Sequence, residues 1–140
     1  MILRIIFLSF LLNIFPNTTF ANNKFFQEGL ALFEDKKFIE AKLKFEQDIV
    51  FNPKSEMAYL YLSKIFKNLD KKDLQEQNLK TVILLNPKNE EAIFNLALLK
   101  IRKSNYNETK KLIKDLKVVC IDLCQKPNVL QKKLDEILKQ

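Results

Sequence analysis

The stretch DIVFNPKSEMA, from Asp48 to Ala58, has a second version later in the chain, VILLNPKNEEA, from Val82 to Ala92. Both contain apolar residues, then Asn-Pro-Lys, a polar residue, an acid and an alanine, and they match with a period of about 34 residues. Proline lacks a backbone N–H and disfavours helix in the residue before it, so each stretch is predicted to end one helix and begin another. The sequence therefore indicates a helical unit that is used more than once.

The segments that flank these turns have the periodicity of helices. Tyr59, Leu62 and Phe66 fall on one face of the segment that follows the first turn. Ser55 and Asn89 stand where they can cap the next helix, and acids follow each of them in its first turn. The chain has a single glycine, whereas hairpins and phosphate-binding loops depend on glycine for positive φ. We therefore expect an all-α protein without a nucleotide-binding loop.

The first residues, MILRIIFLSFLLNIFPNTTFA, have the layout of a secretory signal peptide. Arg4 is their only charge, an apolar stretch follows, and the segment ends on small residues. A spanning helix needs about 20 apolar residues, more than this stretch contains, so an uncleaved anchor fits less well. The sequence predicts a signal peptide over 1–21, cleavage between Ala21 and Asn22, and a periplasmic or secreted mature chain. Contact with the membrane is then expected only through the signal peptide, before cleavage.

Composition argues against catalysis and against nucleic-acid binding. The formal net charge is +7, but lysines alternate with acids as on solvated helix faces, and aromatic residues do not interleave with a basic stripe. The chain has no His, which excludes His general bases, Ser-His-Asp and Cys-His arrangements, and His-containing zinc sites. We expect a protein that is not an enzyme and that takes no cofactor, metal or nucleic acid.

Counting back from Pro53 with this period gives repeats over about 22–55, 56–89 and 90–123, with a last helix over about 127–139. The first repeat reads Phe25, Gly29, Leu32, Ala41, Phe45 and Pro53. This order resembles the tetratricopeptide-repeat (TPR) family, whose pattern is W-x2-L-G-x2-Y, A-x3-F and P. The resemblance covers 22 to about 121. It implies a solenoid of helical hairpins, about three repeats over 22–140, closed by a C-terminal capping helix.

Five residues depart from the family pattern. Glu28 stands where the family has Leu, Lys100 replaces an aromatic residue, and Ile121 replaces the closing Pro. Gln75 and Thr109 replace the small Ala at which paired helices approach closely. A large polar side chain at Gln75 predicts a looser or tilted helix pair.

TPR arrays bind proteins and peptides, and the resemblance implies a concave groove lined by the first helix of each repeat. The family's groove positions correspond here to Phe26, Leu30, Phe33, Met57, Leu60, Lys64, Lys67, Phe94, Leu98, Ile101 and Arg102. Such a groove is expected to be mainly apolar, with three basic groups. The known clamp for a C-terminal carboxylate uses Lys, Asn and Arg, and the matching positions hold Phe26, Leu30, Glu91 and Asn95. We expect that mode to be absent.

Cys120 and Cys124 are the only cysteines, and export makes a disulfide between them one alternative. On a continuous helix their Cβ atoms would lie about 6 Å apart, whereas a disulfide needs about 3.8 Å. Bonding therefore requires the helix to end between them. The other alternative is a pair of small buried apolar residues.

The leading functional hypothesis is an exported scaffold or adaptor that binds another protein, with a role in bacterial envelope assembly suggested by analogy. One alternative is a structural protein that uses its basic surface on envelope lipid or peptidoglycan. Another is a TPR module that associates with itself. Charge-driven surface binding weakens as salt rises, whereas contact in an apolar groove does not, so salt sensitivity is expected to separate the first two.

Overall fold

The computed structural model describes residues 24–139, and every regular element in this part is an α-helix. In chain order the helices are α2 (Lys24–Glu34), α3 (Phe38–Phe51), α4 (Glu56–Asn68), α5 (Lys72–Leu85), α6 (Glu90–Arg102), α7 (Tyr106–Val119) and α8 (Lys126–Leu138). The signal segment and its cleavage site at Ala21–Asn22 lie outside the described residues. The expected all-α fold is confirmed.

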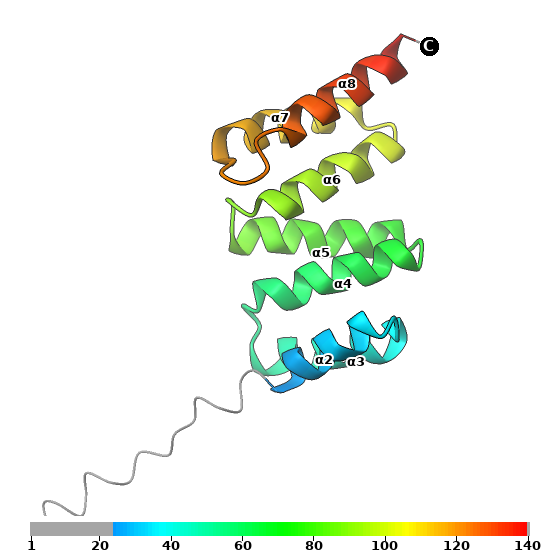
Figure 1. The fold of residues 1–140 in the computed structure, drawn as a ribbon, viewed down its shortest axis with the longest axis vertical. Helices are drawn as coiled ribbons and strands as arrows, with labels where there is room; N and C mark the ends of the chain where they lie inside the picture. The colour runs from blue at the N-terminus through cyan, green and yellow to red at the C-terminus, as the bar shows by residue number, and fades with distance from the viewer. Residues whose placement is uncertain (1–23, 140) are drawn as a thin grey trace, which may run out of the picture.

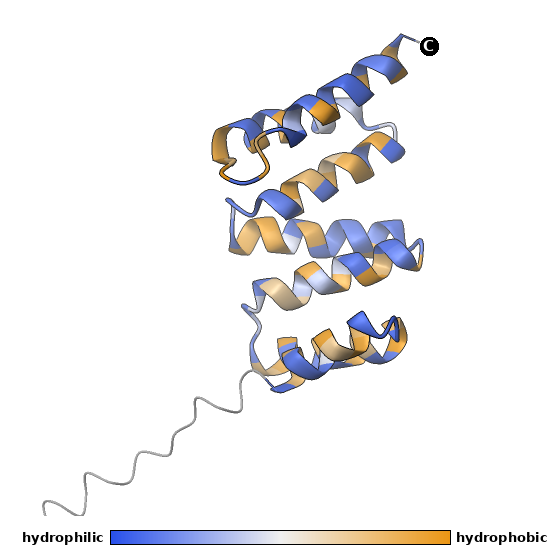
Figure 2. Ribbon diagram, viewed as in Figure 1, coloured by the Kyte–Doolittle hydropathy of each residue, from blue (hydrophilic) through white to orange (hydrophobic). Residues whose placement is uncertain are grey.

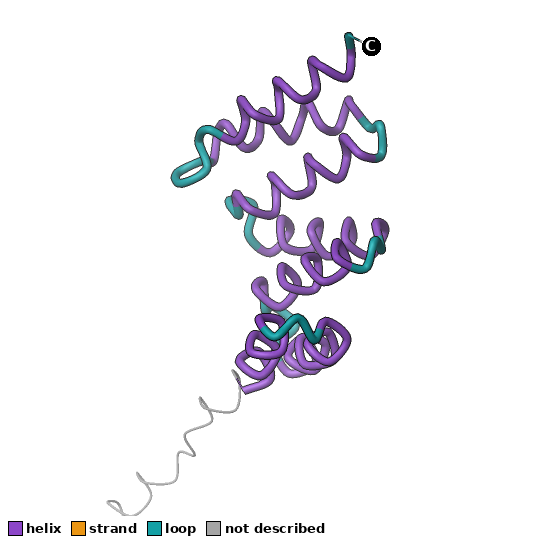
Figure 3. Tube along the Cα trace, turned by 45° about the vertical axis from the view of Figure 1, so that its right-hand side comes forward, coloured by secondary structure: helices purple, strands orange, loops and turns teal. Residues whose placement is uncertain are grey.

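The helices form hairpins that stack in sequence order from the N-terminal to the C-terminal end (Figures 1 and 3). We call α2, α4 and α6 the A helices, and α3, α5 and α7 the B helices. The B helices begin at Phe38, Lys72 and Tyr106, so their starts recur with the period of the Asn-Pro stretches. Each helix packs mainly on its neighbours in sequence, and α8 packs on both α6 and α7. This nearest-neighbour packing is typical of a solenoid.

The turn inside each hairpin contains a residue in the left-handed conformation, and none of these residues is glycine. Lys36, Asp70 and Ser104 have φ values of 61°, 50° and 56°, and they recur with the same period as the helices. After the last of them, the N–H of Asn105 donates to the carbonyl of Lys100 at 2.9 Å. This is a Schellman motif, and the other two hairpins make the same bonds. The A-to-B turn is therefore set by backbone hydrogen bonds.

Side-chain hydrogen bonds hold the Asn-Pro turns between repeats to the helices around them. Asn89 caps α6 as expected, since its Oδ1 accepts from the N–H of Ala92 at 2.8 Å. Ser55 does not cap α4, and its hydroxyl donates instead to the buried carboxylate of Asp48. The Oε1 of Glu56 accepts from the side-chain amide of Asn89. The first turn is thus fixed by a side chain of α3, the helix before it. The second turn is fixed by a side chain of α4, from the repeat that it closes.

Small residues let the first two helices approach closely. A Cβ added to Gly29 would lie 2.8 Å from Cε1 of Phe45, and both Phe45 and Ala41 have no exposed surface. In the second hairpin the corresponding B-helix residue is Gln75, which is 2 % exposed. The looser packing predicted at Gln75 is wrong, because α4 and α5 pack at least as extensively as the other hairpins, whereas the alternative of a tilted pair stays a prediction. The amide oxygen of Gln75 accepts from Nη2 of Arg102 at 3.0 Å, which satisfies a group buried at this contact.

The buried apolar residues form two clusters that meet at α4. The N-terminal cluster consists of Ala41, Phe45, Ala58, Leu62, Ile65 and Phe66. The C-terminal cluster consists of Leu60, Leu79, Val82, Ala92, Ile93, Leu96, Ala97, Leu99, Ile101, Leu112, Ile113, Leu116, Leu130 and Leu134. The last two of these belong to α8, so the final helix closes the core as a cap. Because α4 contributes to both clusters, it couples the first repeat to the rest of the solenoid.

Candidate binding groove

Three adjoining clefts run along the A helices and α8. Their volumes are about 530, 280 and 150 Å³. Asn95 lines all three, Glu91 lines the first and second, and Lys67 and Gln75 line the second and third. The shared residues make the clefts one continuous surface, which we call the groove. It runs from the loop between α7 and α8 past α6 to α4 and Phe33 of α2.

More than half of the predicted groove residues line these clefts. They are Phe33, Lys64, Lys67, Phe94, Leu98 and Arg102. Phe26 and Leu30 pack against the N-terminal cluster, and Met57 is 45 % exposed without lining any of the three clefts. The A helices therefore form the expected groove only in part.

The prediction that Leu60 and Ile101 line the groove is wrong, because both residues are buried in the core. They are only 2 % and 5 % exposed, and both belong to the C-terminal core cluster. The reason is that the A-helix face that carries these side chains packs on neighbouring helices. An aspartate at either position would bury a carboxylate in that core and would test stability instead of binding.

The aromatic residues of the first repeat are engaged with α4. The ring of Tyr61 lies 5.2 Å from that of Phe45, 5.1 Å from Phe33 and 5.9 Å from Phe26, measured between centroids. Lys64 places its ammonium 4.7 Å from the centroid of the same tyrosine. Tyr61 thus packs the first repeat onto α4, and of these four aromatic residues only Phe33 lines a cleft of the groove.

Charge in the groove is mostly positive. Lys64 pairs with Glu91 at 2.9 Å, which neutralises the acid. Lys67, Lys133 and Arg102 have no carboxylate partner within 4 Å among residues 24–139. The groove is therefore more basic than expected, because uncompensated cations from α4, α6 and α8 line the same cleft.

Sequence reasoning missed the contribution of α8. Lys126 lines the largest cleft, with its ammonium 5.2 Å from the ring centroid of Phe94, and Lys133 lines the smallest. These lysines are separated by two helical turns and so share a face, a pattern that could have indicated their role. A capping helix by itself predicts only that its outer face is polar. Asn95 stands in the sequence as a departure from the carboxylate clamp, yet it lines every cleft.

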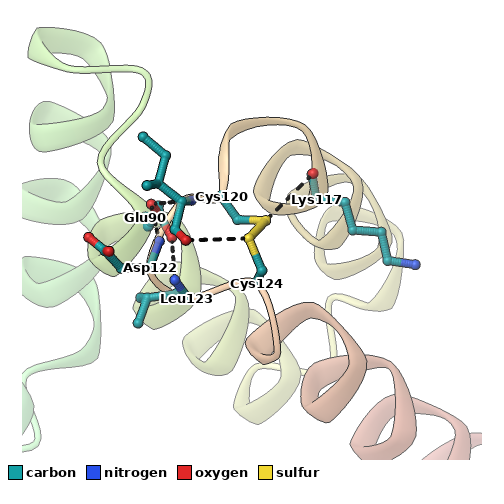
Figure 4. Close-up of a disulfide and its surroundings, with 7 residues drawn as sticks. Glu90, Lys117, Cys120, Asp122, Leu123 and Cys124 are labelled. Carbon is teal, nitrogen blue, oxygen red and sulfur yellow. Dashed lines mark hydrogen bonds between the residues drawn. A yellow bond between two sulfur atoms is a disulfide. The ribbon is translucent and has the colours of Figure 1, made fainter.

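One end of the groove is built by Glu90 and a disulfide loop (Figure 4). Cys120 and Cys124 are bonded, and because α7 ends at Val119 no continuous helix separates them. Glu90 accepts from the backbone N–H of Ile121 at 2.7 Å, with further bonds from the next two residues. Desolvation raises the pKa of Glu90, but these backbone hydrogen bonds outweigh it and leave the pKa below its ordinary value. The loop that replaces the third Asn-Pro turn is thus held by the disulfide and by hydrogen bonds to Glu90.

Lys100, a buried lysine of the third repeat, connects α6 with α7 and with α5 of the preceding repeat. The Lys100 ammonium lies 2.7 Å from a carboxylate oxygen of Glu76 and 2.7 Å from one of Glu108, and its side chain is 5 % exposed. Lys80 and Lys103 also contact Glu76, at 2.7 and 2.9 Å. Desolvation raises the pKa of Glu76, but the hydrogen bonds from these lysines lower it to about 2. The departure from the family pattern at Lys100 is therefore compensated by acids on the two neighbouring helices.

Within 24–139 no group of His, Cys, Asp or Glu side chains is arranged to hold a metal ion. No helix in the same range has the length and apolar character needed to cross a membrane.

Comparison with known proteins supports the fold. No protein-family model and no curated protein matches the chain. Among solved structures, the Arabidopsis OM64 TPR domain aligns at 19 % identity with a TM-score of 0.74, over 83 % of this chain and 95 % of that one. The first TPR of Spaghetti (RPAP3), bound to the HSP90 peptide SRMEEVD, aligns at 16 % identity and TM-score 0.74, over 85 % and 96 % of the two chains.

A bacterial structure is similar over still more of the chain. The Yersinia enterocolitica type III secretion translocator chaperone SycD aligns at 12 % identity with a TM-score of 0.77, over 92 % of each chain. At these identities the likeness concerns the fold. It covers almost all of the described helices, including the hairpins that form the groove. The chain has the fold of a TPR domain.

Proposed function

We propose that this protein is an interaction module that binds an acidic, extended segment of a partner protein in the groove. The observation that carries the proposal is the continuity of the three clefts, with Lys67, Arg102 and Lys133 gathered in the smallest of them and without a carboxylate partner among residues 24–139. Leu98 supplies apolar surface in the same cleft as these cations, and Phe94 supplies it in the largest cleft. A carboxylate-rich segment with apolar side chains would match both features.

The structural neighbours are consistent with this kind of ligand. The Spaghetti (RPAP3) structure is described as bound to the peptide SRMEEVD, and a TPR domain of yeast Sti1 as a complex with pHsp70. This chain does not carry the residues of the known carboxylate clamp, as the sequence indicated. The cations come instead from α4, the end of α6 and α8, so the ligand is expected to lie across the repeats and to need no free C-terminus.

Peptide binding tests this proposal. The probe is an array of heptapeptides that permute glutamate and leucine, measured first with the parent and then by fluorescence anisotropy on the best binder. Lys67→Ala combined with Lys133→Ala is expected to weaken binding at least about tenfold, or about 1.4 kcal/mol. The matched control is Lys110→Ala with Lys111→Ala, two exposed lysines of α7 that line none of the three clefts. Equal loss in both double variants, or no loss in the groove variant, would contradict the proposal.

We also propose that the module acts outside the cytoplasm, in the periplasm or as a secreted protein, with envelope assembly as the process it serves. This rests on the layout of the segment 1–21 alone. Intact-mass measurement on protein from cells is expected to show a chain that begins at Asn22. A chain that still begins at Met1 would refute cleavage at Ala21.

A further inference from the structure

The turns between repeats lie along one edge of the solenoid, on the left in Figure 1. In the last turns of the three B helices, Val50, Leu84 and Val118 recur with the repeat period. They are 75, 81 and 85 % exposed. Figure 2 shows hydrophobic residues gathered at the ends of α5 and α7 on this edge. Three equivalent helix ends thus expose an aliphatic side chain at the same repeat position.

Two further residues extend the row. Phe51 is 66 % exposed and stacks on Phe25 at 5.4 Å, and Ile121, in the disulfide loop, is 82 % exposed. We call Val50, Phe51, Leu84, Val118 and Ile121 the apolar edge. Single exposed apolar residues are ordinary on protein surfaces, whereas several grouped along one edge are typical of an interaction site.

The same edge carries lysines. Lys54 and Lys88 follow the prolines of the two Asn-Pro turns, and Lys117 precedes Val118. All three are exposed, and none has a carboxylate within 4 Å in the described part of the chain. Of the acids nearest to these lysines in sequence, Glu56 accepts from Asn86 and Asn89, and Glu90 accepts from the backbone of the disulfide loop, whereas Asp115 is exposed. Of the acids in the disulfide loop and the turns before α4 and α6, Asp122 is the exposed one.

We propose that the apolar edge docks on an anionic lipid surface. Exposed aliphatic side chains beside basic ones are the combination that partitions into the boundary between headgroups and acyl chains. Each lysine near an anionic leaflet raises the affinity about fivefold. Because the apolar-edge residues recur with the repeat along one edge, several of them can contact the same lipid surface at once.

Other occupants fit this edge less well. A second copy of the chain would bring the same lysines against one another, which disfavours self-pairing. A protein interface usually has one packed apolar core, whereas the apolar-edge side chains come from the ends of three separate helices and a loop. These side chains lie at helix ends and in a loop, from which they can insert between lipid headgroups.

Vesicle co-sedimentation tests the proposal. The mature chain from Asn22 is used, because the apolar segment before it would itself partition into lipid and all described helices lie after it. Vesicles of equal parts phosphatidylcholine and phosphatidylglycerol are expected to bind the chain, and pure phosphatidylcholine vesicles to bind it at least about tenfold less. Leu84→Ser with Val118→Ser, and separately Lys54→Glu with Lys117→Glu, should each lower the anionic-vesicle partition coefficient at least about tenfold.

The matched control is Ile39→Ser with Leu43→Ser, which removes apolar residues of α3 that are 58 and 53 % exposed and precede its last turn. This variant should bind like the parent, and circular dichroism should show equal helicity in all variants. A parent chain that stays in the supernatant overturns the proposal, as does an edge variant that sediments like the control. Self-association that depends on Leu84 and Val118, without lipid binding, would also overturn it. Peptide binding in the groove should be unchanged in the edge variants, so failure here is distinct from failure of the proposed function.

Discussion

Replacing Glu76 by glutamine is expected to destabilise the protein strongly, although the change alters the shape of the side chain little. Glu76 is 13 % exposed and contacts three ammonium groups, of which that of Lys100 is the most buried. Glutamine keeps a carbonyl acceptor but removes the charge that compensates Lys100. Glu108 remains, 2.7 Å from the same ammonium. The variant thus leaves a buried cation with one carboxylate in place of two.

Two separate estimates of the stability lost in Glu76→Gln agree. Removing one partner of a buried ion pair typically costs about 3–5 kcal/mol. The pKa of Glu76 falls from 4.5 to about 2. A shift of that size corresponds to roughly 3 kcal/mol of stability, at about 1.4 kcal/mol per pKa unit. Lys80 is 54 % exposed, so its share of this is small. We expect Glu76→Gln to cost about 3 kcal/mol at neutral pH.

Urea denaturation of four proteins measures this cost and its origin. They are the parent, Glu76→Gln, Lys100→Met and the double variant. Methionine has a similar length without charge, so Lys100→Met removes the need for compensation and should cost less than Glu76→Gln. The double-mutant cycle should give a coupling energy of about 1 kcal/mol or more. A Glu76→Gln cost under about 1 kcal/mol, or two changes that add within about 0.5 kcal/mol, would refute the assigned role of the buried pair.

The pH dependence has a definite sign. Because the folded-state pKa of Glu76 is lowered, its contribution is present above the unfolded value of about 4.5 and is lost as pH falls toward about 2. The stability difference between the parent and Glu76→Gln should therefore be constant above about pH 5 and shrink as the pH falls through this range. A difference that grows on acidification would contradict this reasoning.

Two further substitutions test the packing and the turns. Ala41→Leu should cost about 1–3 kcal/mol in thermal unfolding, because Ala41 has no exposed surface; an unchanged melting temperature would refute the close contact of α2 with α3. Ser104→Gly should stabilise the chain by about 0.5–1 kcal/mol, since φ at Ser104 is 56° and only glycine adopts that conformation without a steric penalty. A destabilised Ser104→Gly variant in urea would show that the unfolded state dominates instead.

The sequence predicted the helical hairpins well because their determinants are local. Proline at Pro53 and Pro87 ends a helix whatever surrounds it, and the spacing of the two prolines sets the repeat. The left-handed turns at Lys36 and Ser104 were not predicted, because neither residue is the glycine that usually marks this conformation. Their geometry comes from the backbone bonds of the Schellman motif, which the residue type does not reveal.

The groove was predicted less well because its lining depends on packing between repeats. The family's position rule placed Leu60 and Ile101 in the groove, but contact between neighbouring hairpins buries them. The compensation of Lys100 was missed for the same reason, since Glu76 lies in the preceding repeat. A pattern read one repeat at a time cannot show which charges will meet.

Salt sensitivity alone does not separate the two proposed binding surfaces. That test assumed an apolar groove opposed to a basic surface, but Lys67 and Lys133 make the groove basic as well. Binding of an acidic segment in the groove and docking of the apolar edge on anionic lipid would both weaken as salt rises. The surfaces differ instead in their residues, since Leu84 and Val118 belong to the apolar edge and line none of the clefts of the groove. Only paired variants can assign a partner to one surface, and a partner that needs both Lys133 and Leu84 would show that one assembly uses them together.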